Sequence, residues 1–470
     1  LATAELANRC GAIGLNLIVD NDTLGSTHLR VPSGSRDKPS IESVKFDLLR
    51  SGIPWEEVRI QNSDLFGSFG QRLQDAIAAS GLFDNAEQQS RLIADLWPHV
   101  VEHSQSDDRL AMCLSAARVR IEHEWGLGNL ELPLSELCAT RSFLAFAAHV
   151  LCRADEFRSV YNEVLAEFRQ TNRIRSQTHP VPELQRVADW VETPFRVWRA
   201  GDQNRAKVFV RRLRSTGSVC EIQLASSPRE SDVFVTFAGP AVSPENAESE
   251  QFEAAIEALE RLPESGIRFR TRALTTTLFA RLCLSDLFIH GIGGAKYDEM
   301  TDRILVRFFK IEPPEFLTLS ASVLLPGLEP FTETAADARR LRQMLRELKH
   351  NPQRHLPATP APHVEALVQE KARLIHEQQS ARQNSRQGLR RPASDRSGSM
   401  RYRRLPAINR ELASQVKEQA DQIREEIAFV ETRLAANAIL RSREYSIALY
   451  PPDRLHRMVD ELRSQFSNSQ

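Results

Sequence analysis

The stretch Asp286–Glu299, DLFIHGIGGAKYDE, constrains the fold more than any other part of this chain. An apolar run reaches His290, three glycines follow within four residues, and a polar, helix-compatible run begins at Lys296. This order predicts a strand, a glycine turn and the N-terminus of a helix. The three glycines are Gly291, Gly293 and Gly294.

Two interpretations of this turn remain open. The glycines can supply positive φ and let a ligand approach the backbone, while the first N–H groups of the helix favour an anion. Alternatively, the turn needs glycine only for steric reasons. The spacing matches neither the dinucleotide-binding fingerprint nor the phosphate loop of nucleotide hydrolases. The histidine, lysine and acidic residues gathered around the glycines favour a binding site.

Composition limits the classes of function. The 470 residues are 41% hydrophobic and 26% charged, which is ordinary for a globular protein with a large core. A net charge of −1 gives no field that favours nucleic acid or membranes, and no apolar run is long enough for a membrane helix. We therefore expect a cytoplasmic protein with a small-molecule substrate, and neither nucleic acid nor membrane as a partner.

Six scattered cysteines without a C-x-x-C pair indicate reduced thiols and argue against a metal site. The chain starts at Leu1 inside helical sequence, so we expect a further segment before it.

An α/β core is predicted in two parts, residues 1–62 and 190–330. The apolar run Leu15–Val19 indicates a buried strand of a parallel sheet. It ends at Asp20, Asn21 and Asp22, and the carboxyl ends of such strands are where open α/β sheets bind ligands. A solvated turn rich in Asp and Asn is the alternative. Strand-like and helical segments alternate over 190–330, which favours a parallel, doubly wound sheet.

The remaining segments are mainly helical. Residues 63–189 are expected to form a helical insertion whose last loop carries Arg173 and Arg175. These guanidinium groups suit a carboxylate or phosphate, although an exposed basic loop would have the same composition. Residues 331–437 are predicted to form a helical arm with a flexible basic linker at 380–404. From Val416 to Leu434, apolar residues recur at coiled-coil spacing. Residues 438–470 are expected to dock on the core.

Several blocks of the sequence resemble one family when they are taken in order. They are Leu17–Asp22, Arg272, the predicted helix 274–284, Phe288–Ile289, Gly293–Gly294, Lys296–Glu299, Pro313–Pro314 and Ser320–Ser322. This order resembles the bacillithiol biosynthesis cysteine-adding enzyme (BshC) family. The resemblance implies a Rossmann-like parallel-sheet core with helical insertions and a C-terminal helical coiled-coil arm. Ala295 stands where that family has proline, and the family's N-terminal motif is not in this chain.

The resemblance also implies a reaction. That family attaches cysteine to an amino sugar conjugate, so we expect a ligase or transferase that joins a small amino acid to an amine, with ATP or ADP as nucleotide. His290 would move a proton, and Asp20 and Asp22 would hold the amine. The expected binding residues are Asn21, Arg173, Arg175, Arg272, Gly291, Gly293, Gly294, Lys296, Tyr297, Asp298 and Ser320.

Other functions compete with this one. His290 could simply close a strand by bonding a neighbouring backbone group. The protein could be a noncatalytic nucleotide-binding or coiled-coil scaffold that forms a homodimer through the arm, and a nucleotidyltransferase of the HIGH type is a third option. If the first hypothesis holds, Asp20–Asp22 and His290–Lys296 should face one cleft at the carboxyl ends of neighbouring parallel strands.

Overall fold

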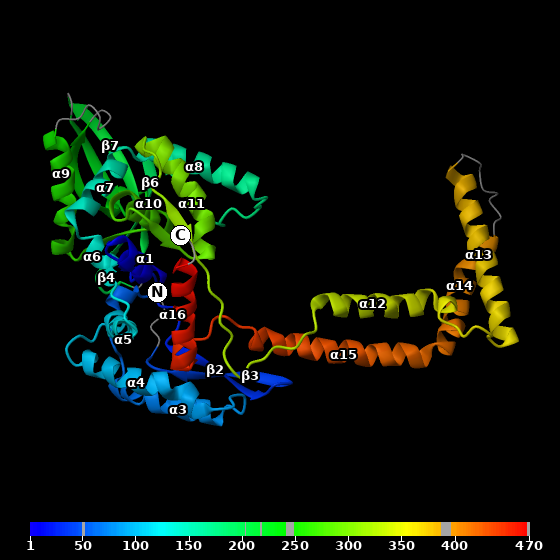
Figure 1. Cartoon of the computed structure of the whole chain (residues 1–470). Helices are drawn as coiled ribbons and strands as arrows, with labels where there is room; N and C mark the ends of the chain where they lie inside the picture. The colour runs from blue at the N-terminus through cyan, green and yellow to red at the C-terminus, as the bar shows by residue number, and fades with distance from the viewer. Residues whose placement is uncertain (49–51, 203, 217–218, 241–248, 387–395, 468–470) are drawn as a thin grey trace.

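A mixed α/β body carries a long helical arm (Figure 1). The computed structural model describes residues 1–48, 52–202, 204–216, 219–240, 249–386 and 396–467. Within the body, one core is built around the largest sheet and a second around a β-hairpin with three helices. The arm leaves the body beside the hairpin.

The largest sheet is antiparallel, which corrects the prediction of a parallel sheet over 190–330. Its strand order is β10-β6-β7-β8-β9, and β5 pairs with β6 at the edge. The strands are β5 (Arg186–Val187), β6 (Trp190–Arg199), β7 (Ala206–Thr216), β8 (Val219–Ala225), β9 (Val233–Pro240) and β10 (Ile267–Thr271). One face of this sheet is apolar and buried, and the other carries charged side chains.

Parallel pairing occurs in two small, separate sheets. The strand before Asp20, β1 (Leu15–Ile18), pairs with β4 (Leu130–Pro133). The strand that ends at His290, β11 (Phe288–His290), pairs with β12 (Phe316–Thr318). Each strand that precedes a predicted site therefore has a parallel partner, but the two pairs do not belong to one sheet.

Helices cover the apolar face of the antiparallel sheet (Figure 1). They are α7 (Arg141–Cys152), α8 (Ala154–Thr171), α9 (Ser249–Glu260), α10 (Ala273–Cys283) and α11 (Ile292–Ile304). Phe143 of α7 is fully buried among the rings of Phe195, Phe269 and Phe279, with ring centroids 5.4 to 6.3 Å apart. Burying rings of this size is worth roughly 2–3 kcal/mol each, so this cluster locks the helices onto the sheet.

The second core joins early and late parts of the chain. Its hairpin is β2 (His28–Ser35) with β3 (Lys38–Lys45), and its helices are α3 (Phe69–Ala79), α4 (Ala86–Ser104) and α5 (Leu110–Glu124). The C-terminal segment inserts Tyr445, Leu449 and Tyr450 into this core. The last helix, α16 (Pro452–Ser467), then contacts α1 (Ala2–Cys10), where Arg463 pairs with Glu5 at 3.3 Å.

The arm consists of two helix pairs. Helix α12 (Ala335–His350) packs on α15 (Lys417–Leu440), and α13 (Pro362–Arg386) packs on α14 (Arg396–Gln415). The apolar residues predicted on α15 lie in the first contact, where Val430 joins Ala338 and Leu341. The linker expected at 380–404 is corrected in part, because 380–386 belong to α13 and 396–404 to α14. Residues 387–395 lie outside the described residues.

Candidate functional site

His290 and Asp298 form the most specific polar contact near the predicted turn. His290 ends β11, and its Nδ1 lies 2.8 Å from Oδ2 of Asp298 in α11. The Asp298 carboxylate is fully buried, whereas the imidazole keeps 28% of its surface exposed. A carboxylate on Nδ1 favours the tautomer that carries its proton there, which leaves Nε2 as a proton acceptor.

The glycines after His290 do not adopt the left-handed backbone conformation that the sequence analysis offered as one reason for them. None of Gly291, Gly293 and Gly294 has a positive φ, and helix α11 begins at Ile292 with Gly291 as its N-cap. A Cβ at Gly293 would meet nothing within 4 Å. A Cβ at Gly294 would lie only 1.9 Å from Nε2 of His290. The glycine requirement is therefore steric, and it comes from the imidazole packed against the first turn of the helix.

A buried arginine completes this site. Arg281 of α10 is 1% exposed and lies 3.6 Å from Asp298 and 2.6 Å from Asp302. Its guanidinium also donates to the carbonyl of Pro314 and lies over the ring of Phe316, in the strand that pairs with β11. Two carboxylates and a carbonyl offset the cost of burying this charge. Arg281 therefore contributes a buried positive charge beside Asp298, although the two side chains share no hydrogen bond.

The other residues predicted around the turn lie on its rim. Lys296 is exposed and makes no hydrogen bond or ion pair with any described residue. Tyr297 is half-buried between the rings of Phe168 and His179, both 6.3 Å away. Ser320 is exposed just beyond β12. The loop of His179 carries two further predicted residues, Arg173 and Arg175, and both are exposed.

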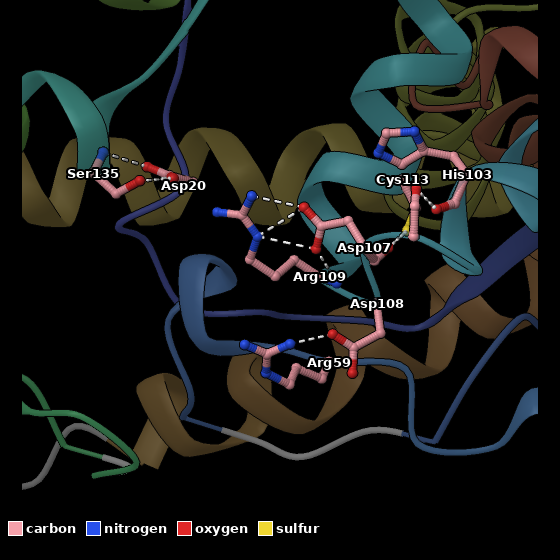
Figure 2. A network of polar contacts seen from close by, with 9 residues as sticks. Asp20, Arg59, His103, Asp107, Asp108, Arg109, Cys113 and Ser135 are labelled. Atoms are coloured by element: carbon pink, nitrogen blue, oxygen red, sulfur yellow. Dashed lines mark hydrogen bonds and ion pairs between the residues drawn. The ribbon is translucent and has the colours of Figure 1, made fainter.

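The predicted acidic segment serves mainly to hold the fold together. Asp20 is buried and accepts hydrogen bonds from the N–H of Ser135, at 2.9 Å, and from its hydroxyl (Figure 2). Ser135 lies in α6 (Leu134–Leu137), directly after β4. Asn21 is also buried, and its side chain donates to the carbonyl of Thr271 at 3.1 Å. These contacts tie the loop after β1 to α6 and to the antiparallel sheet.

The polar network beside Asp20 is internally paired (Figure 2). Arg109 binds Asp107 through three hydrogen bonds of 2.6 to 3.0 Å, and Arg59 pairs with Asp108. Cys113 donates to the carbonyl of Asp107 at 3.0 Å, and burial raises the pKa of its thiol to about 11. A thiol with that pKa stays protonated near neutral pH, so this network offers no nucleophile.

A second charged cluster lies on the polar face of the antiparallel sheet. The predicted residue Arg272 donates to Glu192 at 3.0 Å, and Lys207 donates to the same carboxylate at 2.8 Å. Arg205 binds the carbonyl of Asn21 and the carboxylate of Asp22, both at 2.7 Å. Asp22 and Arg272 therefore belong to one neighbourhood.

Helix α10 separates this cluster from His290. Arg272 is the N-cap of α10, and Arg281 lies in its last turn. Nine residues of α-helix place their Cα atoms roughly 14 Å apart along the axis. The strands before Asp20 and His290 lie in separate sheets, so the expectation that they are neighbouring parallel strands was wrong. That the two clusters face one cleft stays a prediction.

Several residues of these sites were absent from the prediction. They include Glu192, Arg196, Arg205 and Lys207, from β6, β7 and the segment between them. Arg281 is the single charged residue of α10. Glu192 and Arg196, four residues apart in the largely apolar sequence of β6, were the available signal, because alternate residues of a strand share a face.

The comparisons provide no relatives from which to infer a function. No protein-family model, curated protein or solved structure matches this chain. Among the described residues, no helix is both long and apolar enough to cross a membrane. In the same residues, no three His, Cys, Asp or Glu side chains are grouped so that they could hold a metal ion.

Proposed function

We propose that this protein is a ligase or transferase that joins a small, cysteine-like amino acid to an amine-bearing molecule and uses ATP or ADP. The order of sequence blocks that resembles the bacillithiol cysteine-adding enzymes supports the proposal. The observation that carries it is the His290–Asp298 pair at the start of α11. Lys296 and the first N–H groups of α11 would bind a phosphate or carboxylate.

The geometry suits proton removal from an amine. In amide formation, the amine nitrogen attacks the carboxyl carbon, and the C–N bond forms as the carboxyl oxygen leaves. That oxygen leaves as water or, where ATP activates the acid, on phosphate. Nε2 of His290 would take the amine proton, and Asp298 would stabilise the resulting imidazolium. The free N–H groups at the start of α11 could stabilise the oxyanion that develops on the carbonyl.

The test is to measure condensation of cysteine with amino sugars by mass spectrometry, with and without ATP, where the product has the summed mass less one water. His290→Gln should abolish the product without lowering the melting temperature, because glutamine keeps polarity but cannot accept the proton. His123→Gln is the matched control, since His123 is exposed on α5. Equal rates for His290→Gln and the unaltered protein would rule out the proposed role of His290.

A noncatalytic role in assembly is the second candidate, and the arm supports it. Phe429 of α15 is 53% exposed and Met344 of α12 is 44% exposed, although both helices already bury an apolar face against each other. A homodimer through the arm would bury these two side chains against a second chain. A homodimer through the arm predicts twice the chain mass in light scattering and the monomer mass for Phe429→Glu. A monomer at all concentrations would contradict it.

A further inference from the structure

The polar face of the antiparallel sheet holds more positive than negative charge. In the pairing of β10, β6 and β7, Arg270, Arg196 and Lys207 lie directly opposite one another. Cross-strand neighbours of this kind have Cβ atoms about 5 Å apart, and like charges in such positions destabilise a sheet. This row of three cations therefore requires negatively charged groups on the same face of the sheet.

The residues that the structure describes supply too few negative groups to balance these cations. Arg270 is paired with Glu56 through hydrogen bonds of 2.7 and 2.9 Å. Lys207 and Arg272 must share Glu192, which is fully buried between them. One carboxylate for two cations leaves one positive charge without a counterion.

Arg196 adds a second such charge. Its side chain is half-buried at the centre of this row, and it forms no hydrogen bond or ion pair with the described residues. Burial lowers the pKa of its guanidinium, and the positive charges of Arg272 and Arg205 lower it further. The Glu192 carboxylate, which Lys207 and Arg272 already share, opposes this shift only in part. Arg205 itself is matched by Asp22. The neighbourhood thus has two uncompensated positive charges, on Arg196 and on the Lys207–Arg272 pair.

We propose that Arg196, Arg205, Lys207 and Arg272 form a binding site for a phosphate group of a small molecule. A phosphate monoester or terminal phosphate is a dianion above its second pKa of about 6, so it matches two uncompensated charges where a single carboxylate would not. Guanidinium forks bind phosphate oxygens through paired hydrogen bonds, and a lysine adds a point charge. The side chains of Arg205 and Lys207 are 25% and 35% exposed, so a ligand can reach them.

This site lies at the far end of α10 from His290, and it does not depend on the proposed ligase activity. Binding alone tests it, with calorimetric titration of inorganic pyrophosphate into the whole protein at low ionic strength. The unaltered protein should bind pyrophosphate, and acetate should not compete. Arg196→Gln should weaken binding about ten- to hundred-fold, the usual contribution of one charge-assisted contact.

Arg211→Gln is the matched control. Arg211 lies on β7 like Lys207, but Glu230 balances its charge at 2.9 Å, so its replacement should leave pyrophosphate affinity unchanged. Thermal unfolding provides a separate readout. Without ligand, Arg196→Gln should melt at or above the temperature of the unaltered protein because repulsion is relieved, whereas a structural arginine would lower it. No pyrophosphate binding, equal affinity in Arg196→Gln, or equal competition by acetate would overturn the proposal.

Discussion

His290 lies against Gly294, and this contact distinguishes two adjacent glycines whose sequence context is nearly the same. Gly294 leaves space for the imidazole, whereas Gly293 faces open space in the same helical turn. Glycine in a helix costs roughly 0.5–1 kcal/mol relative to alanine. Gly293→Ala should therefore stabilise the protein by about that amount.

Gly294→Ala should do the opposite at the site. The added methyl group would displace the imidazole and break its 2.8 Å contact with Asp298. We expect the imidazole resonances of His290 to move in NMR spectra at constant pH, and no gain in the free energy of unfolding. If Gly294→Ala left the His290 imidazole resonances unchanged, the packing described between imidazole and helix would be incorrect.

The buried thiols give a prediction for alkaline pH. Burial raises the thiol pKa from 9.0 to about 11 for Cys113 and to about 12 for Cys138 and Cys152. Between pH 9 and these values the folded protein holds more protons than the unfolded chain, so the free energy of unfolding falls as the pH rises through this window. Denaturant titrations at several pH values measure this slope.

Thiol labelling at pH 8 is the companion measurement. Cys10 and Cys283 are exposed and should react in the native protein, Cys283 more slowly because partial burial raises the pKa of its thiol, whereas the four buried cysteines should react only after unfolding. Rapid reaction of more than two thiols in the native protein would contradict the burial described.

At the scale of elements, the sequence predicts the existence of strands better than their pairing. The strands over 190–240 were expected, but their parallel arrangement was not found. The chain itself contained the contrary signal, because only residues 200–205, 217–218 and 226–232 separate β6, β7, β8 and β9. A parallel pair needs a crossover of about a dozen residues or more, so these short connections require antiparallel neighbours.

The local sequence pattern predicted the helices and the turn at His290 better than it predicted the pairing of strands. The apolar spacing on α15 placed Val430 and its neighbours in the contact with α12, because side chains three and four residues apart share one helical face. The strand, histidine and helix order around His290 was also predicted. The ion-pair partners of Arg281 and Glu192 were not predicted. Each partner comes from a distant segment of the chain, and sequence alone does not specify such contacts.

The start of α12 carries a capping box that local sequence explains. Thr334 and Asp337 exchange side-chain and backbone hydrogen bonds, including one of 3.0 Å from the Thr334 N–H to the Asp337 carboxylate. Thr334→Ala should lower the free energy of unfolding by about 1 kcal/mol. Thr432→Ala, on the exposed face of α15, is the control and should change it less. Equal urea midpoints for the two variants would contradict a role for the cap.

At the scale of the whole molecule, the arm depends on one junction with the body. Here α15 returns to the second core, and the segment that leads into α12 departs beside it (Figure 1). Asn437 of α15 is buried and accepts a hydrogen bond from the N–H of Phe331 at 2.8 Å. Its amide also donates to the carbonyl of Phe331 at 2.9 Å. Asn437 thus links the two segments that support the arm, alongside the ion pair of Arg433 with Glu333.

Removing that side chain should loosen the arm at its base. Asn437→Ala leaves the N–H of Phe331 buried without this acceptor, whereas its carbonyl keeps a hydrogen bond from Arg441 at 2.8 Å. An unsatisfied buried donor costs about 1–3 kcal/mol. We therefore expect faster hydrogen exchange from 331 into α12, with the antiparallel sheet unchanged. Asn351→Ala, at the other end of α12, is the matched control, because Asn351 bonds only within its own turn to Glu347 at 3.1 Å. If both variants exchanged alike, the Asn437 junction would not be what fixes the arm to the body.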